Sequence, residues 1–194
     1  MKRKIIFASK NPGKIREVKK IINGADIELI SLLELNYPSE IDETGTTFEE
    51  NAKIKAAEVY NKYKIPAMGD DSGLSVDQLF GAPGVYSARY AGQGANDDDN
   101  NRKLLRELEK FKEPHHAKYI CCAVYFDGEN YTISEGEVEG IIIKEPKGNN
   151  GFGYDPFFVP DGYQQTMGEL PLDEKNKISH RSKAFKSLKD ALKF

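Results

Sequence analysis

The chain has 194 residues, of which 39% are hydrophobic and 30% are charged, a composition typical of a folded domain with one core. Its 28 basic and 31 acidic side chains give a net charge of −3, so overall charge supplies no attraction to nucleic acid or to an anionic membrane. The basic opening is followed only by the short apolar run Ile5–Ala8, and no apolar run is long enough for a signal peptide or a membrane span. We therefore expect one cytoplasmic domain, residues 1–194, with neither nucleic acid nor membrane as a partner.

Strand and helix patterns alternate in the first half of the chain. Apolar spacing predicts strands at 4–8, 27–31 and 65–68 and helices at 13–22 and 47–63. Thr47 and Glu50 are spaced as a capping box at the start of the second helix. The third strand is expected to end at Met68, just before an acidic pair.

The second half combines helices with an antiparallel pattern. It predicts a helix at 97–111, strands at 117–126, 130–138 and 140–144, and a final helix capped by Ser179. Asp127–Asn130 is typical of a hairpin turn, which makes the sheet mixed and the class α/β. The connections 80–96 and 147–172 are long, which favours a site lined by loops.

The two cysteines, Cys121 and Cys122, are neighbours in a predicted strand. Neighbouring strand residues point to opposite faces of the sheet, so we expect buried free thiols and no disulfide between them.

Asp70 and Asp71 lie between Gly69 and Gly73, at the predicted end of the third strand. Adjacent carboxylates repel each other, and a hard divalent cation is a natural stabiliser. A surface turn is the alternative, because Asp, Ser and Gly are common turn residues. Glu43, just before the helix at 47–63, is a candidate third carboxylate or a solvated loop residue.

The segment Ser9–Lys14, Ser-Lys-Asn-Pro-Gly-Lys, lies between the first predicted strand and helix. Free backbone N–H groups at a helix start and the Lys14 ammonium favour a phosphate. A turn at Asn11, Pro12 and Gly13 with solvated lysines is the alternative. On the next helix, most of Glu49, Asn51, Lys53 and Lys55 are interpreted as a charged solvent face with i,i+4 pairing, although a lysine there can reach phosphates.

Gly151–Asp155, Gly-Phe-Gly-Tyr-Asp, places an aromatic ring between two glycines. Phe152 or Tyr154 can stack on a base, and Asp155 can accept hydrogen bonds from it. An aromatic cluster beneath a loop is the alternative. Lys175, His180 and Arg181 add donors near a helix start, where they also fit a cap with surface charge.

These segments, in this order, resemble the Ham1-like inosine triphosphate pyrophosphatase family. The resemblance rests on six segments that span most of the chain: Ser9–Lys14, Glu43–Gly45 with Thr47–Ala52, Asp70–Gly73, Gly81–Arg89, Gly151–Asp155 and Ser179–Arg181. The chain departs from the family at Ser9 and Lys10, where the family usually has Thr and a small residue. Serine keeps the hydroxyl, so the departure concerns only fine phosphate geometry.

The resemblance implies an ITPase-like or Maf-like α/β fold, with a mixed curved sheet and two lobes around a nucleotide-binding cleft, usually as a homodimer. It implies hydrolysis of dITP, ITP and XTP to the monophosphate and pyrophosphate with Mg²⁺. Glu43 and Asp71 would hold the metal, with Asp70 a further candidate, and Asp71 would accept a proton. Phosphate or sugar would contact Ser9, Lys10, Asn11, Pro12, Gly13, Lys14, Ser72 and Lys175, and the base would contact Phe152, Gly153, Tyr154, Asp155, His180 and Arg181.

Two other functions remain open at the level of sequence. A pyrophosphatase for another nucleotide class would share the metal site and differ in its base contacts. A nucleotide-binding module without catalysis would bind the same ligands without turnover.

Overall fold

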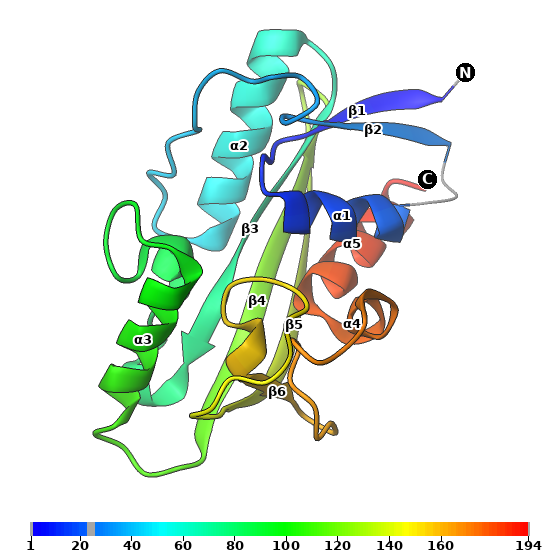
Figure 1. Cartoon of the computed structure of the whole chain (residues 1–194). Helices are drawn as coiled ribbons and strands as arrows, with labels where there is room; N and C mark the ends of the chain where they lie inside the picture. The colour runs from blue at the N-terminus through cyan, green and yellow to red at the C-terminus, as the bar shows by residue number, and fades with distance from the viewer. Residues whose placement is uncertain (1, 23–25, 194) are drawn as a thin grey trace. The chain divides into compact units, whose positions relative to one another are not determined.

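The structure is a computed structural model that describes residues 2–22 and 26–193. Six strands form one sheet in the order β2-β1-β3-β4-β5-β6 (Figure 1). The strands are β1 (Arg3–Phe7), β2 (Ile27–Ser31), β3 (Ala67–Val76), β4 (His115–Phe126), β5 (Tyr131–Ile142) and β6 (Phe158–Pro160). The helices are α1 (Pro12–Ile22), α2 (Phe48–Tyr63), α3 (Asp97–Leu108), α4 (Leu172–Ile178) and α5 (His180–Ala191), with short 3₁₀ helices at Asp77–Leu79, Gly84–Arg89 and Asp155–Phe157.

The sheet is mixed, which confirms the predicted α/β class. β1 pairs in parallel with both β2 and β3, whereas β5 pairs antiparallel with β6. Parallel neighbours need a crossover between them, and α1 and α2 lie in the connections that lead from β1 to β2 and from β2 to β3.

The chain separates into two compact units. The first unit comprises the residues up to Asp71, then Cys121–Gly136 and the residues from Arg181 onward. The second comprises Ser72–Ile120 and Glu137–His180. β3, β4 and β5 contribute residues to both units, and the predicted single domain and cleft stay predictions.

Alternating side chains of the first unit's strands separate its core into two layers. On one side, Ile5 and Phe7 of β1 pack with α1 and α5. On the other side, Ile6 of β1 belongs to the cluster that contains Val59 of α2. The same alternation places Cys121 in the first layer and the adjacent Cys122 in a cluster with α2, which confirms two buried free thiols.

The prediction that the third strand ends at Met68 is wrong, because β3 continues to Val76. Asp70 and Asp71 are therefore inside a buried strand and are not in a turn after it. A strand can hold two adjacent carboxylates because each points to a different face, where separate partners can neutralise it.

Other boundaries also differ from the predictions. The strands expected at 130–138 and 140–144 are one continuous strand, β5, and β6 and α4 were not predicted. Gly140 interrupts the apolar pattern of β5. A Cβ atom at this position would lie 2.2 Å from the Val159 carbonyl oxygen of the paired β6, so the close pairing needs a glycine. α3 ends at Leu108 and does not reach Phe111, and α5 begins at His180, directly after Ser179.

Two local predictions are confirmed. The Thr47 side chain accepts from the Glu50 amide, and Glu50 accepts from the Thr47 amide, which forms the capping box of α2. Asp127 accepts from the Glu129 and Asn130 amides in the turn between β4 and β5. Within residues 2–22 and 26–193, no helix is long and apolar enough to cross a membrane.

Gly69 lets β3 approach α2 closely. A Cβ atom at Gly69 would lie 2.3 Å from the Ala52 carbonyl oxygen and 3.1 Å from the Ala56 amide nitrogen, both in the backbone of α2. Backbone atoms inside a packed helix cannot move aside as the end of a flexible side chain can.

We expect Gly69→Ala to lower the free energy of unfolding by about 3 kcal/mol, because the added methyl group must displace helix backbone. Urea denaturation measures this loss. Gly94→Ala is the matched control: Gly94 has φ +77°, and nothing lies within 4 Å of its added Cβ, so strain alone should cost about 1 kcal/mol. Equal losses in the two variants would contradict the close approach.

Candidate functional site

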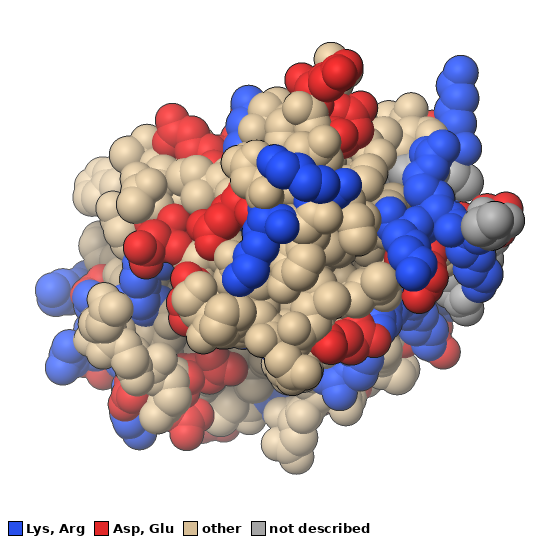
Figure 2. All heavy atoms as spheres, turned by 90° about the horizontal axis from the view of Figure 1, so that it is seen from above, with Lys and Arg blue, Asp and Glu red and all other residues tan. Residues whose placement is uncertain are grey.

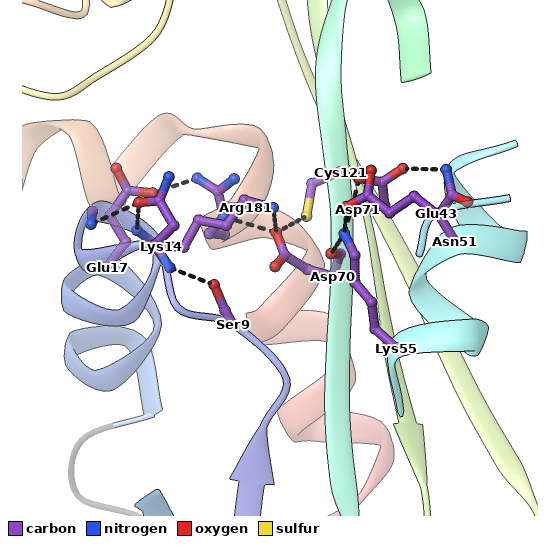
Figure 3. Close-up of polar contacts among 12 residues, drawn as sticks. Ser9, Lys14, Glu17, Glu43, Asn51, Lys55, Asp70, Asp71, Cys121 and Arg181 are labelled. Atoms are coloured by element: carbon purple, nitrogen blue, oxygen red, sulfur yellow. Dashed lines mark hydrogen bonds and ion pairs between the residues drawn. The ribbon is translucent and has the colours of Figure 1, made fainter. Parts of the chain in front are cut away.

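Asp70 and Asp71 point to opposite faces of β3 (Figure 3). The Asp70 carboxylate lies on the side of α1 and α5, where it contacts Lys14 and Arg181. The Asp71 carboxylate lies on the side of α2, where it contacts Asn51 and Lys55. The acidic pair thus belongs to two different polar clusters in the first unit.

The Asp70 cluster is a buried ion network. Lys14 Nζ lies 3.1 Å from Asp70 Oδ2, and Arg181 Nε donates to the same oxygen at 3.2 Å. Arg181 Nη1 donates to Glu17 Oε2 at 2.6 Å, and the Cys121 thiol lies 3.9 Å from Asp70 Oδ2. Figure 3 shows Lys14 and Glu17 reaching this point from α1. The network includes Arg181, which is only 1% exposed.

Cations determine the protonation state of Asp70. Burial by itself raises the pKa of this carboxyl, but the charges of Lys14, Arg181 and Lys55 outweigh burial and hold its pKa well below its ordinary value. Arg181 shows the converse: burial lowers its pKa, but Glu17 and Asp70 outweigh that effect and raise it. Asp70 is therefore a permanently ionised group at neutral pH.

The Asp71 cluster is built by α2 and the loop before it. Asn51 Nδ2 donates to Asp71 Oδ2 at 3.0 Å, and Lys55 Nζ lies 3.3 Å from Asp71 Oδ1. Lys55 Nζ also lies 2.5 Å from Glu43 Oε1 and donates to the Asp70 carbonyl oxygen at 3.0 Å. Asn51 and Lys55 are one helical turn apart, so one face of α2 supplies both contacts.

Asp71 differs from Asp70 in its affinity for protons. Burial raises the pKa of Asp71, and the nearby Glu43 charge adds to the increase, whereas Lys55, Lys14 and the Asn51 hydrogen bond oppose it. The net direction is upward. Asp71 is therefore a better proton acceptor than an ordinary aspartate.

The predicted metal ligands separate into a pair and a single residue. Glu43 and Asp71 both contact the Lys55 ammonium, so their oxygens surround one cationic point. Asp70 faces the other side of β3, and among the described residues no three His, Cys, Asp or Glu side chains converge as a metal site. Two carboxylates are what Mg²⁺ commonly takes from a protein, with water and phosphate oxygens as its other ligands. The Glu43–Asp71 pair fits such an ion.

The start of α1 is held by side chains of the predicted phosphate segment. Asn11 Oδ1 accepts from the Gly13 and Lys14 amides at 2.8 and 3.1 Å, and Ser9 Oγ accepts from the Asn11 amide at 3.2 Å. Pro12 is the first residue of the helix, a position that needs no N–H donor. Asn11 therefore caps α1, which already contains Pro12 and Gly13. The alternative of a turn with solvated lysines is wrong for Lys14, which pairs with the buried Asp70, and phosphate binding by Ser9–Lys14 stays a prediction.

Lys10 and Ser72 are two other predicted phosphate contacts. Lys10 Nζ lies 3.4 Å from Glu40 at the surface of the first unit. Ser72 follows Asp71 in β3, is half-buried, and is the first residue of the second unit.

On the face shown in Figure 2, basic and acidic side chains are interspersed.

The second unit contains the predicted base-binding segment. Lys175 Nζ lies 2.6 Å from Asp155 Oδ2, and both side chains are buried. The same Asp155 oxygen accepts from the Phe152 amide at 2.9 Å, and Lys175 Nζ lies 5.1 Å from the centroid of the Phe152 ring. One buried ion pair therefore fixes the backbone of the loop that carries the aromatic ring.

Tyr154 and His180 are both buried in the second unit. The Tyr154 hydroxyl donates to the Ser87 carbonyl oxygen at 2.8 Å, which favours a structural role for this ring. The His180 ring stacks on Tyr119, with centroids 4.7 Å apart and planes at 9°. The predicted base contacts of Tyr154, His180 and Arg181 stay predictions.

Sequence reasoning missed Glu17, and it interpreted Asn51 and Lys55 as part of a solvated helix face. That interpretation is wrong, because Lys55 is buried between Glu43 and Asp71. Its spacing of four residues from Asn51, on a helix that begins just after Glu43, was an available signal. Glu17 offered none, because its partner Arg181 is 164 positions away.

The fold and the site together define an α/β protein whose buried carboxylates and lysines can bind a charged ligand. A model of the Ham1 family matches residues 5–191, and the chain belongs to this family. It is 50% identical over 188 residues to a dITP/XTP pyrophosphatase of Bacillus licheniformis, and 49% identical over 189 residues to that of Bacillus subtilis, with 96% of each chain covered in both comparisons.

Solved structures agree with this assignment. A HAM1 protein from Coxiella burnetii has a TM-score of 0.89 and 39% identity, with 98% of each chain covered. The Staphylococcus aureus Ham1 protein has a TM-score of 0.86 and 38% identity, again with 98% of each chain covered.

We expect Arg181→Met to lower the free energy of unfolding by about 3–5 kcal/mol, because it removes the guanidinium that neutralises two buried carboxylates. Adding Glu17→Gln should restore part of the loss by removing one of those charges. Chemical denaturation of the single and double variants tests this. Arg102→Met is the control, since this arginine pairs with Asp99 at the surface and should contribute less than about 1 kcal/mol. Equal losses for Arg181→Met and Arg102→Met would contradict the network.

Proposed function

We propose that this protein hydrolyses the nonstandard purine nucleoside triphosphates dITP, ITP and XTP to the monophosphate and pyrophosphate. The observation that carries the proposal is the buried Asp71, with its raised pKa, in contact with Lys55 beside Glu43. The curated relatives named dITP/XTP pyrophosphatase, similar over nearly the whole chain, support the choice of substrate.

Asp71 accepts the proton of the attacking water in this proposal. The water oxygen forms a bond to the α-phosphorus, the bond between that phosphorus and the bridging oxygen of pyrophosphate breaks, and the proton passes to an Asp71 carboxylate oxygen. Asn51 and Lys55 hold that carboxylate in position. A proton acceptor with a raised pKa is better suited to neutral pH than an ordinary aspartate.

Nucleotide pyrophosphatases generally need a divalent metal, and we propose Mg²⁺ held by Glu43 and Asp71. When bound, the ion stabilises negative charge on phosphoryl oxygens and lowers the pKa of a bound water. Asp70 is proposed to act from the other face, as the fixed charge that holds Lys14 and Arg181.

Lys14 and the start of α1 are proposed to bind the triphosphate, together with Ser9, Asn11 and Ser72. The Lys14 ammonium and the positive end of the helix dipole offset phosphate charge. Gly13 is buried at this helix start, and its amide donates to Asn11 Oδ1. Lys10 would add a further positive charge at the surface.

The second unit is proposed to recognise the base. Phe152 stacks on the purine ring, and the backbone of Gly153 allows close approach. Asp155 and Lys175 supply an acceptor and a donor, and His180 donates to the 6-keto oxygen. Arg181, which belongs to the first unit and pairs there with Glu17 and Asp70, is proposed as a further donor to that oxygen. Adenine has an amino donor at that position, so it would leave buried donors unpaired.

The assembly and location are also part of the proposal. We propose a homodimer acting in the cytoplasm, with both units forming one catalytic domain. Each unit is built from separated segments, and three strands contribute residues to both, which supports a single folding unit.

We expect kcat/KM for dITP, ITP and XTP to exceed that for dATP by about 100-fold in the presence of Mg²⁺, because adenine leaves buried donors unpaired. We also expect dITP, ITP and XTP to be preferred over dGTP. Pyrophosphate release across this panel, extended to dUTP and dTTP, measures the preference. Chelation with EDTA should abolish turnover, and added Mg²⁺ should restore it. Comparable rates on all purines would contradict the specificity, preferred hydrolysis of a pyrimidine would favour another nucleotide class, and binding without turnover would favour a non-catalytic module.

The same assay tests the proton acceptor. Asp71→Asn keeps the size of the side chain and should lower kcat by about 100-fold or more. Asp26→Asn is the matched control because Asp26 is exposed in the first unit. Full activity in Asp71→Asn would contradict the mechanism.

We expect Phe152→Ala to raise the KM for dITP about 5- to 150-fold, because base stacking on an aromatic ring contributes about 1–3 kcal/mol. The value of kcat should change little, since stacking is equally strong in the ground and transition states. Phe80→Ala is the matched control, because Phe80 is 99% exposed in the same unit. A KM for dITP unchanged by Phe152→Ala would exclude this ring as the stacking partner.

A further inference from the structure

Glu17 is a buried carboxylate of the first unit that the proposed mechanism does not use. It lies on α1 one helical turn after Lys14, on the same face of the helix, and is only 2% exposed. Its Oε2 accepts from Arg181 Nη1 at 2.6 Å, and both side chains of this ion pair are buried. A buried ion pair often stabilises a fold no more than apolar side chains of similar size. The pair therefore calls for a role beyond stability.

The Arg181 guanidinium is held by two different carboxylates. Nη1 donates to Glu17 Oε2, and Nε donates to Asp70 Oδ2 at 3.2 Å (Figure 3). A guanidinium commonly pairs with a single carboxylate through two parallel N–H groups. Asp70 Oδ1, which would complete such a pair, is buried and has no hydrogen-bond partner among the described residues. Glu17 thus fixes the guanidinium in an orientation that leaves this second contact unmade.

The position of Lys14 depends on that orientation. Lys14 Nζ lies 3.1 Å from Asp70 Oδ2, the same oxygen that Arg181 Nε contacts. A guanidinium released from Glu17 can turn and give a second N–H group to Asp70, where it competes with the Lys14 ammonium. The Lys14 side chain is 16% exposed and that of Arg181 only 2%. Lys14 is therefore the cation that would be displaced toward solvent.

We propose that Glu17 is a positioning residue of the phosphate site: by holding Arg181 Nη1, it leaves Asp70 to hold the Lys14 ammonium in place. This role rests on the proposed function, in which Lys14 binds the triphosphate. Charge alone predicts the opposite effect of losing Glu17, because removing a negative charge beside the site should strengthen the binding of an anion. Loss of the Lys14 position should weaken it.

Inorganic tripolyphosphate is the probe, because it carries the phosphates without a base. Calorimetric titration of the full chain in excess Mg²⁺ measures its Kd. Glu17→Ala removes both the charge and the acceptor, and Kd should rise about tenfold, the size of one lost charge-assisted contact. Glu17→Gln removes the charge but keeps a carbonyl oxygen for Arg181 Nη1, so Kd should stay within about twofold. Glu28→Ala, which removes the same charge from an exposed position on β2, is the matched control.

Two further variants test the route and protect against misfolding. Glu17→Asp keeps the charge but withdraws the carboxylate by one methylene, so it is a milder change that should raise Kd about threefold. In a Lys14→Met background, Glu17→Ala should leave Kd unchanged, because no ammonium remains to be placed.

The outcomes separate this role from the proposed function. A Kd that is unchanged or lower in Glu17→Ala and Glu17→Asp, or losses that add to that of Lys14→Met, would overturn the role of Glu17 even if dITP is hydrolysed. Absence of tripolyphosphate binding to the unmodified chain would overturn it as well. The expected Kd values in a protein that hydrolyses no nucleotide would support the role of Glu17 and overturn the proposed function.

Discussion

The geometry of the first unit depends on one constraint: two adjacent aspartates inside a buried strand must be neutralised separately, because their side chains point to opposite faces. α1 and α5 supply Lys14 and Arg181 to Asp70 on one face, and α2 supplies Lys55 to Asp71 on the other. The helices that pack against each face of β3 therefore also supply the cations that neutralise its aspartates. The same helix positions satisfy both packing and charge, so the stability of this unit depends on the groups that form its site.

The two faces give chemically different carboxylates. Two cations contact Asp70 directly and hold its pKa below its ordinary value, whereas burial and Glu43 raise the pKa of Asp71 against a single contacting lysine. A pair of carboxylates whose environments move their pKa values apart is the arrangement by which enzymes assign distinct roles to like groups. Under the proposed function, Asp70 is the fixed charge that positions Lys14 and Arg181, and Asp71 is the group that takes a proton. The two residues are neighbours in sequence, but their side chains lie on opposite faces of β3.

Local patterns allowed most of the fold to be predicted, since the capping box at Thr47, the turn after Asp127 and the alternation at Cys121 and Cys122 are all short-range. The predicted end of β3 at Met68 was too early, because adjacent aspartates indicate a turn when the cations that neutralise them are not evident from the sequence. Those partners come from distant segments: Arg181 reaches Asp70 across 111 positions. Lys55 was misread for the same reason, because burial of a lysine depends on carboxylates that local spacing does not bring together.

Base discrimination under the proposed function follows from burial in the second unit. Asp155, Lys175 and His180 are each less than 5% exposed. Water therefore cannot readily satisfy these groups, and a base that leaves one of them without a hydrogen-bond partner loses binding free energy. A hydrophobic pocket alone distinguishes rings of similar size weakly, whereas unpaired buried groups distinguish them strongly. Since the Asp155–Lys175 pair also holds the Phe152 amide, a mismatch that disturbs the pair also displaces the stacking ring. Polar recognition and stacking are thus linked through one carboxylate oxygen, which makes rejection of a wrong base cooperative.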